Sequence, residues 1–269
     1  MISKLRITLL LPLAALLACG STPSGTSTQT NAYNFSGDWG VRTEANPDTI
    51  QITGFSGALS ATAGVVSGEL TTYTNPFTPC MTPSITPVPV SGTVSADGNL
   101  TLSLPVAGGT ATLSATLTTN LNTFASGTYQ VVGGTCAMAA TAMQIAQYAP
   151  LSGTYTGTFS VLNSYDLPTP GTATTITAVL SQSATNTGAE FPVTGTVTTT
   201  GACVVSFTLS NTYVWGGVMM AGDSTFSYSL IAGFDPTGSV TDIGIFTDSV
   251  TGSNCPNAGQ YFDGVLTRQ

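Results

Sequence analysis

The sequence predicts an all-β protein made of two tandem antiparallel meander modules of about eight strands each, folded as small barrels or sandwiches. The first observation is an alternation of apolar and polar residues with period two, as in residues 100–104 (LTLSL) and 205–209 (VSFTL). The second is a set of short turn sequences between such runs. The third is an internal repeat that divides the 269-residue chain into two similar parts.

Alternating segments bury one face and leave the other in water, which is the pattern of antiparallel strands. Turn sequences separate these segments: residues 97–99 (DGN), 108–109 (GG), 133–134 (GG) and 235–238 (DPTG). Residues 137–148 are the one candidate helix, because Ala, Met and Gln favour helices. We expect a strand there, because the corresponding residues 258–266 of the second part alternate like a strand.

The internal repeat rests on motifs that recur in the same order. Two of them are residues 35–40 (FSGDWG) with 151–156 (LSGTYT), and residues 66–72 (VSGELTT) with 193–199 (VTGTVTT). Two cysteines follow in each part, and all offsets lie between 116 and 127 residues. Similarity at a nearly constant offset indicates homologous modules. We expect module 1 over residues 34–149 and module 2 over residues 150–269.

The N-terminus has the form of an export signal. Two cations precede an apolar run over residues 7–17, which is too short to span a bilayer as a stable helix. Residues 16–19 (LLAC) resemble the lipobox of bacterial lipoproteins, which is a Leu, a variable residue, a small residue and a Cys. The resemblance implies removal of residues 1–18 as a signal peptide. It also implies diacylglycerol on the Cys19 thiol and a fatty acid such as palmitate on the new amino group.

The residues after the lipobox predict where the protein resides. Residues 19–33 would be the lipidated cysteine and a flexible tether, because their Gly, Ser, Thr, Pro and Gln are too polar to form a core. Gly20 in place of Asp implies, by the same resemblance, the outer membrane. The lipobox and the Thr/Gly-rich strands also resemble a family of acidobacterial lipoproteins, which implies location and no activity. We expect an exported protein anchored in the cell envelope.

Lipidation of Cys19 would leave four cysteines in an oxidising compartment: Cys80, Cys136, Cys203 and Cys255. Four cysteines allow three connectivities. Because the repeat gives each module one pair, we expect disulfides from Cys80 to Cys136 and from Cys203 to Cys255. Loop entropy predicts that each would stabilise the fold by about 4 kcal/mol. Four unpaired buried thiols are the alternative.

The composition excludes several classes of function. Only 6% of the residues are charged and there is no His. Without the signal peptide the chain keeps two cations, Arg42 and Arg268, and all twelve carboxylates. Its net charge is then −10. Nucleic acids and anionic headgroups attract clustered cations, so neither is an expected partner. Without His or Lys the usual general bases and imidazole ligands are absent, so we expect no enzyme, no cofactor and no metal.

Three groups of residues suggest chemistry, and we expect a structural role for each. Paired carboxylates hydrolyse glycosides across one cleft, but Glu69 and Glu190 belong to different modules. Residues 213–217 (YVWGG) offer a platform for stacking a sugar, although an aromatic at the end of a hairpin strand is the commoner arrangement. The third group could supply oxygen ligands for calcium, and it consists of Asp235, Asp242 and Asp248. These residues lack the spacing of a calcium-binding loop.

Each module opens with a glycine and an aromatic, in residues 37–39 (GDW) and 153–155 (GTY). These openings resemble the first strand of lipocalins and avidin-like barrels, in which the aromatic plugs one barrel end. In lipocalins an Arg near the chain end packs over that aromatic. The resemblance therefore implies that Trp39 and Tyr155 are barrel plugs. It also places Arg268 within about 6 Å of the Tyr155 ring, the range of a cation–π contact.

These expectations favour a non-enzymatic, membrane-anchored lipoprotein that binds a small apolar or carbohydrate ligand. The alternative is a structural or interaction protein of the cell envelope with no small-molecule ligand. The barrel interiors distinguish the two. An open apolar cavity would favour ligand binding, and an interior filled by side chains would favour the structural role.

Overall fold

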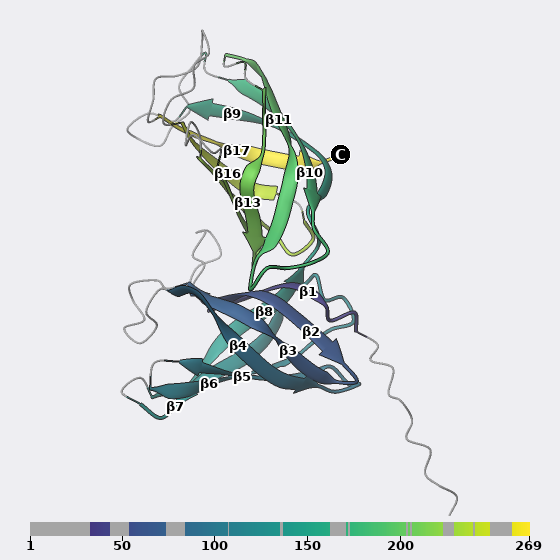
Figure 1. Ribbon diagram of the computed structural model, residues 1–269, viewed down its shortest axis with the longest axis vertical. Coiled ribbons are helices and arrows are strands. Elements are labelled where there is room, and N and C mark those ends of the chain that lie inside the picture. The colour runs from purple at the N-terminus through teal and green to yellow at the C-terminus, as the bar shows by residue number, and fades with distance from the viewer. Residues whose placement is uncertain are drawn as a thin grey trace, which may run out of the picture.

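The computed structural model describes residues 33–43, 54–73, 84–106, 108–134, 137–161, 171, 173–202, 204, 206–222, 229–238, 240–247 and 260–269. These residues form seventeen strands and no helix, which confirms the all-β prediction (Figure 1). None of them belongs to a helix that could cross a membrane. The strands form two antiparallel meanders that follow one another along the chain.

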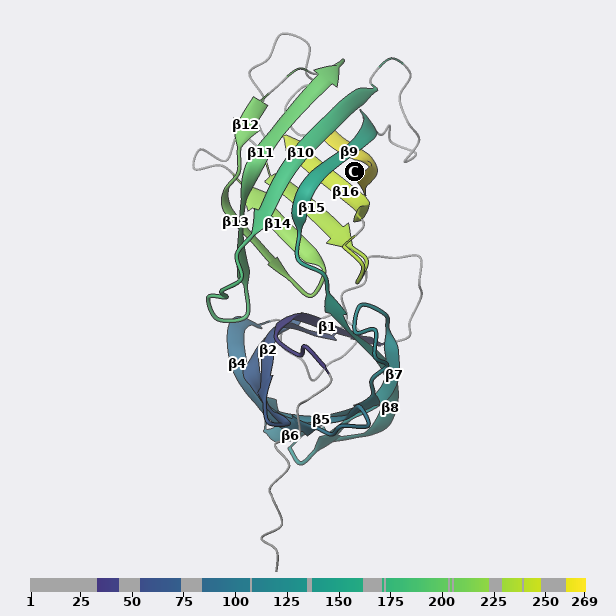
Figure 2. The ribbon, with the colours of Figure 1, turned by 90° about the vertical axis from the view of Figure 1, so that its right-hand side faces the viewer.

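The first eight strands form a closed barrel, called barrel 1: β1 (Gly37–Thr43), β2 (Gly54–Thr62), β3 (Val65–Tyr73), β4 (Ser84–Val94), β5 (Asn99–Val106), β6 (Gly109–Thr116), β7 (Ala125–Val132) and β8 (Met138–Tyr148). Each strand pairs with the next, and β8 returns to pair with β1 from Asp38↔Tyr148 to Thr43↔Met143. Strand β8 confirms that residues 137–148 are a strand. Figure 2 shows this barrel end-on.

The other nine strands form a curled sheet, called barrel 2: β9 (Ser152–Val161), β10 (Thr174–Gln182), β11 (Phe191–Gly201), β12 (Ser206–Thr208), β13 (Ser210–Trp215), β14 (Val218–Gly222), β15 (Ser229–Phe234), β16 (Val240–Thr247) and β17 (Gln260–Arg268). The last strand, β17, pairs with the first, β9. Because β10 pairs with both β9 and β11, the pairings run in a ring. The join between β11 and β13 is short, at two residue pairs.

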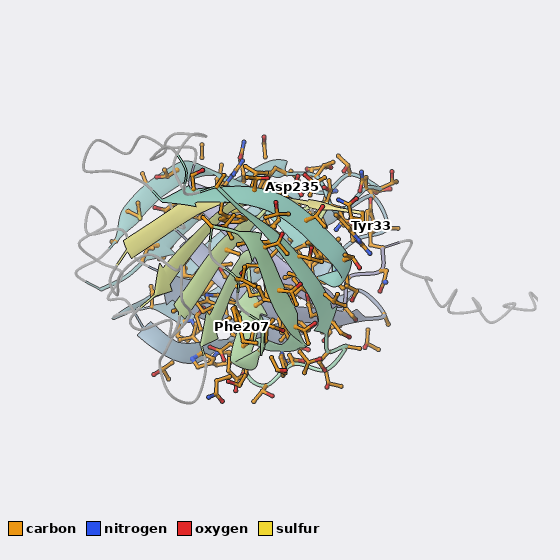
Figure 3. The ribbon with its side chains drawn as sticks, turned by 90° about the horizontal axis from the view of Figure 1, so that it is seen from above. Tyr33, Phe207 and Asp235 are labelled. Atoms are coloured by element: carbon orange, nitrogen blue, oxygen red, sulfur yellow. The ribbon has the colours of Figure 1, made fainter. Side chains whose placement is uncertain are left out.

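The predicted alternation places the core inside barrel 1. Leu100, Leu102 and Leu104 are buried, and Thr101 between them is exposed. Apolar side chains from the barrel's strands meet in one cluster around Trp39. Tyr33, the last residue of the expected tether and labelled in Figure 3, packs against this cluster. Each such buried side chain contributes about 1.5–3 kcal/mol, so alternation and closure together account for the barrel.

Barrel 2 has its own core, in which Tyr155 and Phe159 of β9 are fully buried. Phe207 of β12, also labelled in Figure 3, packs against this core. Ala58, from β2 of barrel 1, belongs to the same cluster. The two cores are therefore separate except where the β2 face of barrel 1 meets barrel 2.

The outer face of barrel 2 carries hydroxyls in place of charges. Threonines of neighbouring strands stand side by side, as in the rows Thr156–Thr177–Thr198 and Thr158–Thr175–Thr200 across β9, β10 and β11. Strands lie about 4.8 Å apart, so the rows form a regular array. No charged residue occupies an outward position of these three strands. A chain with few charges thus gains its polar surface from Thr and Ser.

The predicted turns lie between the expected strands. Residues 97–99 lie at the β4–β5 turn, where Gly98 has φ +81° and a Cβ would lie 2.6 Å from the Leu117 carbonyl oxygen. Residues 235–238 form the β15–β16 turn. There the Asp235 carboxylate accepts hydrogen bonds from the backbone N–H and the hydroxyl of Thr237. These sequences therefore fix the register of both hairpins, as turn chemistry predicts.

Candidate functional site

Barrel 2 stands on the outer face of barrel 1, and we call this contact the junction. It joins the β1–β2 face and the end of β8 to three connections of barrel 2, at residues 183–190, 216–217 and 235–238. The Gly216 N–H donates to Oδ1 of Asp38 at 2.6 Å. The Ala149 N–H donates to the Pro236 carbonyl at 2.9 Å. Figure 2 shows the end of barrel 2 resting on the wall of barrel 1.

Glycines permit the close approach at the junction. Gly216 and Gly217 form the β13–β14 turn with φ of +54° and +81°, the left-handed region that favours glycine. A Cβ on Gly216 would collide with Ser56, and one on Gly217 would collide with the Tyr148 ring. On the opposite side, a Cβ on Gly40 would lie 2.7 Å from Tyr148 Cε2. The same Cβ on Gly40 would lie 3.1 Å from the Gly216 carbonyl oxygen, so the two backbones approach closely beside the Tyr148 ring.

Asp38 lies at the centre of the junction. Because Trp39 points into barrel 1, its neighbour Asp38 points outward, onto a face that the Gly216–Gly217 turn covers. Only 2% of Asp38 is exposed. Its Oδ2 atom and the buried Ser56 Oγ find no hydrogen-bond partner among the described residues. A carboxyl group on the outer wall of a barrel is thus buried with one oxygen unsatisfied.

The buried position changes the protonation of Asp38. Desolvation raises the pKa of this carboxyl to about 7, and the backbone amides of Gly216, Gly217 and Trp39 act in the opposite direction. Burial also raises the pKa of Tyr148, helped by the negative charges of Asp38 and Asp235 and opposed by Arg42. Asp38 therefore titrates near neutral pH.

Arg42 is held by other groups. Its guanidinium carbon lies 3.6 Å from the centroid of the Phe124 ring, a cation–π contact. Its Nε donates to Gln144 Oε1 at 2.9 Å. The Phe124 ring meets the Tyr148 ring edge-on at 6.4 Å. A chain of contacts thus links Arg42 to the junction through two aromatic rings.

The residues expected as barrel plugs occupy the barrel interiors. Trp39 is fully buried, its Nε1 donates to the Phe35 carbonyl at 2.9 Å, and its ring stacks on Phe35 at 4.3 Å. Tyr155 is fully buried in barrel 2. Arg268 is paired with Tyr155 between β17 and β9, so the last strand of the curled sheet lies beside its first. Burial raises the pKa of Tyr155, and the Arg268 charge and the Ser152 backbone lower it.

Two other groups that the sequence suggests, the carboxylates Glu69 and Glu190 and residues 213–217, lie at the junction or in a turn next to it. A Cβ on Gly188 would lie 3.4 Å from Glu69 Oε2, so Glu69 faces the connection that carries Glu190. Membership of different modules therefore does not by itself separate these two carboxylates. Burial raises the pKa of Glu190. Residues 213–217 end in the β13–β14 turn, and Trp215 is largely buried, as the hairpin interpretation predicts.

Metal ligands do not gather in the described part of the chain. The Asp235 carboxylate accepts a hydrogen bond from Thr237 within its own turn. Asp242 lies on β16, and Asp248 lies outside the described residues. No three His, Cys, Asp or Glu side chains among the described residues are placed to hold a metal ion. The calcium alternative therefore gains no support from these residues.

Cys19 and the other four cysteines lie outside the described residues. Connections of an antiparallel meander alternate between the two ends of its barrel. The described ends of β3, β4, β7 and β8 that flank Cys80 and Cys136 in the sequence thus lie at the same end of barrel 1. The described ends of β11, β12, β16 and β17 that flank Cys203 and Cys255 likewise lie at one end of barrel 2. The strand order is compatible with one disulfide in each barrel.

Peptide mapping without reduction should link the Cys80 peptide to the Cys136 peptide, and the Cys203 peptide to the Cys255 peptide. The reason is that the described strand ends flanking the two members of each pair lie at the same end of the same barrel. Reduction should release all four peptides, which is the control. A bond from Cys136 to Cys203 would contradict the prediction, because it would join the two barrels.

The sequence did not identify Asp38 as part of a site. Its position in an alternating strand indicates a surface residue, and nothing local to β1 shows that another module covers it. The closest signal is the adjacent pair Gly216 and Gly217, which the sequence associates with a sugar-stacking platform or a hairpin and not with a contact between modules. Comparison with family models, with curated proteins and with solved structures finds no match to this chain.

Proposed function

We propose that this chain is a non-enzymatic lipoprotein of the cell envelope that acts as a structural or interaction protein. Residues 16–19 support anchoring through lipid on Cys19, and Gly20 supports the outer membrane. The resemblance to acidobacterial lipoproteins supports the same location. The folded part would stand off the membrane on the tether.

The filled interior of barrel 1 is the observation that carries this proposal. Large side chains from several strands occupy its centre with at most 1% of their surface exposed: Trp39, Phe55, Leu70, Leu102, Leu113, Met143 and Ile145. Eight strands enclose a space just wide enough for side chains. A small ligand would have to displace this core, at a cost of several kcal/mol. The packing therefore favours a scaffold over a carrier of a small apolar or carbohydrate molecule.

The outer surface supports a role in contacts with other molecules. Rows of Thr side chains on barrel 2 offer hydroxyl donors and acceptors with no fixed charge. The junction stacks two barrels into one elongated unit (Figure 1). An anchored protein of this shape would present a long hydroxyl-rich face to the envelope.

Mass spectrometry of the full-length protein purified from membranes tests both parts of the proposal. We expect a mass that includes lipid on Cys19, and no small molecule retained in native conditions. Cys19→Ser should lack the lipid mass and move to the soluble fraction, because no other anchor is expected. A ligand retained at one per chain would contradict the structural role, and membrane retention of Cys19→Ser would contradict the lipid anchor.

A further inference from the structure

We propose that the junction is a latch controlled by pH, in which a proton on Asp38 tightens the contact between the two barrels. This inference does not depend on the proposed function, because it concerns only the contact of barrel 2 with barrel 1. It rests on the position of one carboxyl group and on the groups around it.

The unsatisfied polar atoms at the junction suit a protonated carboxyl. Oδ1 of Asp38 accepts the Gly216 N–H at 2.6 Å, while Oδ2 finds no partner among the described residues. Ser56 Oγ is also buried and unsatisfied among those residues, and it borders the same glycine. Asp38 and Ser56 lie on neighbouring strands, where Asp38 pairs with Ala58 and Gly40 with Ser56. A proton on Oδ2 would supply a donor where the neighbouring strand offers an acceptor.

Among the described residues, no cation pairs with an ionised Asp38 at the junction. Tyr148 stands opposite it on β8, and Asp235 faces Tyr148 from the β15–β16 turn. Glu69 of β3 faces the connection that carries Glu190. Arg42 is the one cation nearby among the described residues, and Phe124 and Gln144 hold it. A buried charge without a partner is costly, so ionisation of Asp38 works against docking.

The direction of the pH effect follows from linkage. When the barrels separate, Asp38 returns to water and to its ordinary pKa of 3.8, whereas in the docked state its pKa is about 7. The docked state therefore binds the proton more tightly. The extra docking strength is fully present below pH 3.8, is lost progressively as pH rises to about 7, and is constant above that. Over this window the opening constant rises about tenfold per pH unit, about a thousandfold in all.

Amide hydrogen exchange on the full mature chain measures this opening. The Gly216 amide is the reporter, because it donates to Asp38. After correction for intrinsic exchange rates, its protection factor should fall about tenfold per unit from pH 4 to pH 7 and then level off. A Gly216 protection factor that does not change with pH would overturn the proposal.

Asp38→Asn is the main variant, because its amide keeps the shape and the donor of the protonated acid. The protection factor of the Gly216 amide should stay high and lose its pH dependence. Glu69→Gln and Asp235→Asn are matched controls that remove other carboxylates near the junction, and both should keep the wild-type slope. If Asp38→Asn kept the slope, or if either control abolished it, the proposal would be wrong.

A direct titration needs no variant. Carbon NMR of the Asp38 carboxyl in the wild-type chain should show a pKa of about 7, well above the ordinary value of 3.8. A midpoint close to 3.8 would overturn the latch even if the variants failed to fold.

Discussion

Replacing Trp39 by alanine should lower the free energy of unfolding by about 3–5 kcal/mol. Trp39 is the largest fully buried side chain of barrel 1. Its removal would lose the stacking on Phe35 and the hydrogen bond from Nε1 to the Phe35 carbonyl, and would leave a cavity at the barrel centre. Because β1 closes the barrel against β8, the whole closure would weaken.

Guanidinium unfolding followed by circular dichroism measures the loss for Trp39→Ala. Thr101→Ala is the matched control, because Thr101 is exposed on the outer face of β5, and such surface changes stay within about 0.5 kcal/mol. Trp39→Phe should lie between the two, since it keeps an aromatic ring and loses the Nε1 donor. A loss below 1 kcal/mol for Trp39→Ala would show that Trp39 does not hold the barrel together.

Replacing Gly217 by valine should separate the two barrels while each keeps its strands. The new Cβ would collide with the Tyr148 ring, and relief of such overpacking costs about 1–3 kcal/mol. A β-branched residue at φ +81° adds about 1–2 kcal/mol of backbone strain. The collision is relieved if the β13–β14 turn leaves barrel 1, whereas the backbone strain stays within the turn. The junction is therefore the contact that should open.

Small-angle X-ray scattering of the full mature chain measures this separation as an increase in maximum dimension. Gly171→Val is the matched control, because Gly171 also has a positive φ, at +78°, but has open space around its Cβ position. The control should share the backbone strain and leave the scattering curve unchanged. A wild-type curve for Gly217→Val would mean that Tyr148 moves aside and that the close approach is not required.

The fold could be predicted from the sequence because its signals are local. The leucines at 100, 102 and 104 alternate with hydroxyl residues, and one turn sequence ends each strand, so strand and register follow from neighbours in the chain. The repeat motifs indicated two modules because the same signals recur. Even β8, with its helix-favouring Ala and Met residues, could be identified from its partner in the second module.

The junction could not be predicted because its signals are not local. Alternation shows that Asp38 points away from the barrel interior but not that residues 178 positions later in the chain cover it. Glu69 and Glu190 were separated by module, yet Glu69 faces the connection that carries Glu190. Such contacts depend on how one barrel docks on another. A pattern within one strand contains no information about that docking.

The threonine rows of barrel 2 also determine how its surface responds to ionic strength. Dissolved salt screens the attraction between exposed fixed charges that lie more than a Debye length apart, about 8 Å at physiological concentration. The outward positions of β9, β10 and β11 hold no such charges. Their hydroxyls exchange hydrogen bonds with water or with another molecule's hydroxyls, and screening has little effect on those bonds. Any contact that this face makes should therefore keep its strength from dilute fresh water to concentrated brine.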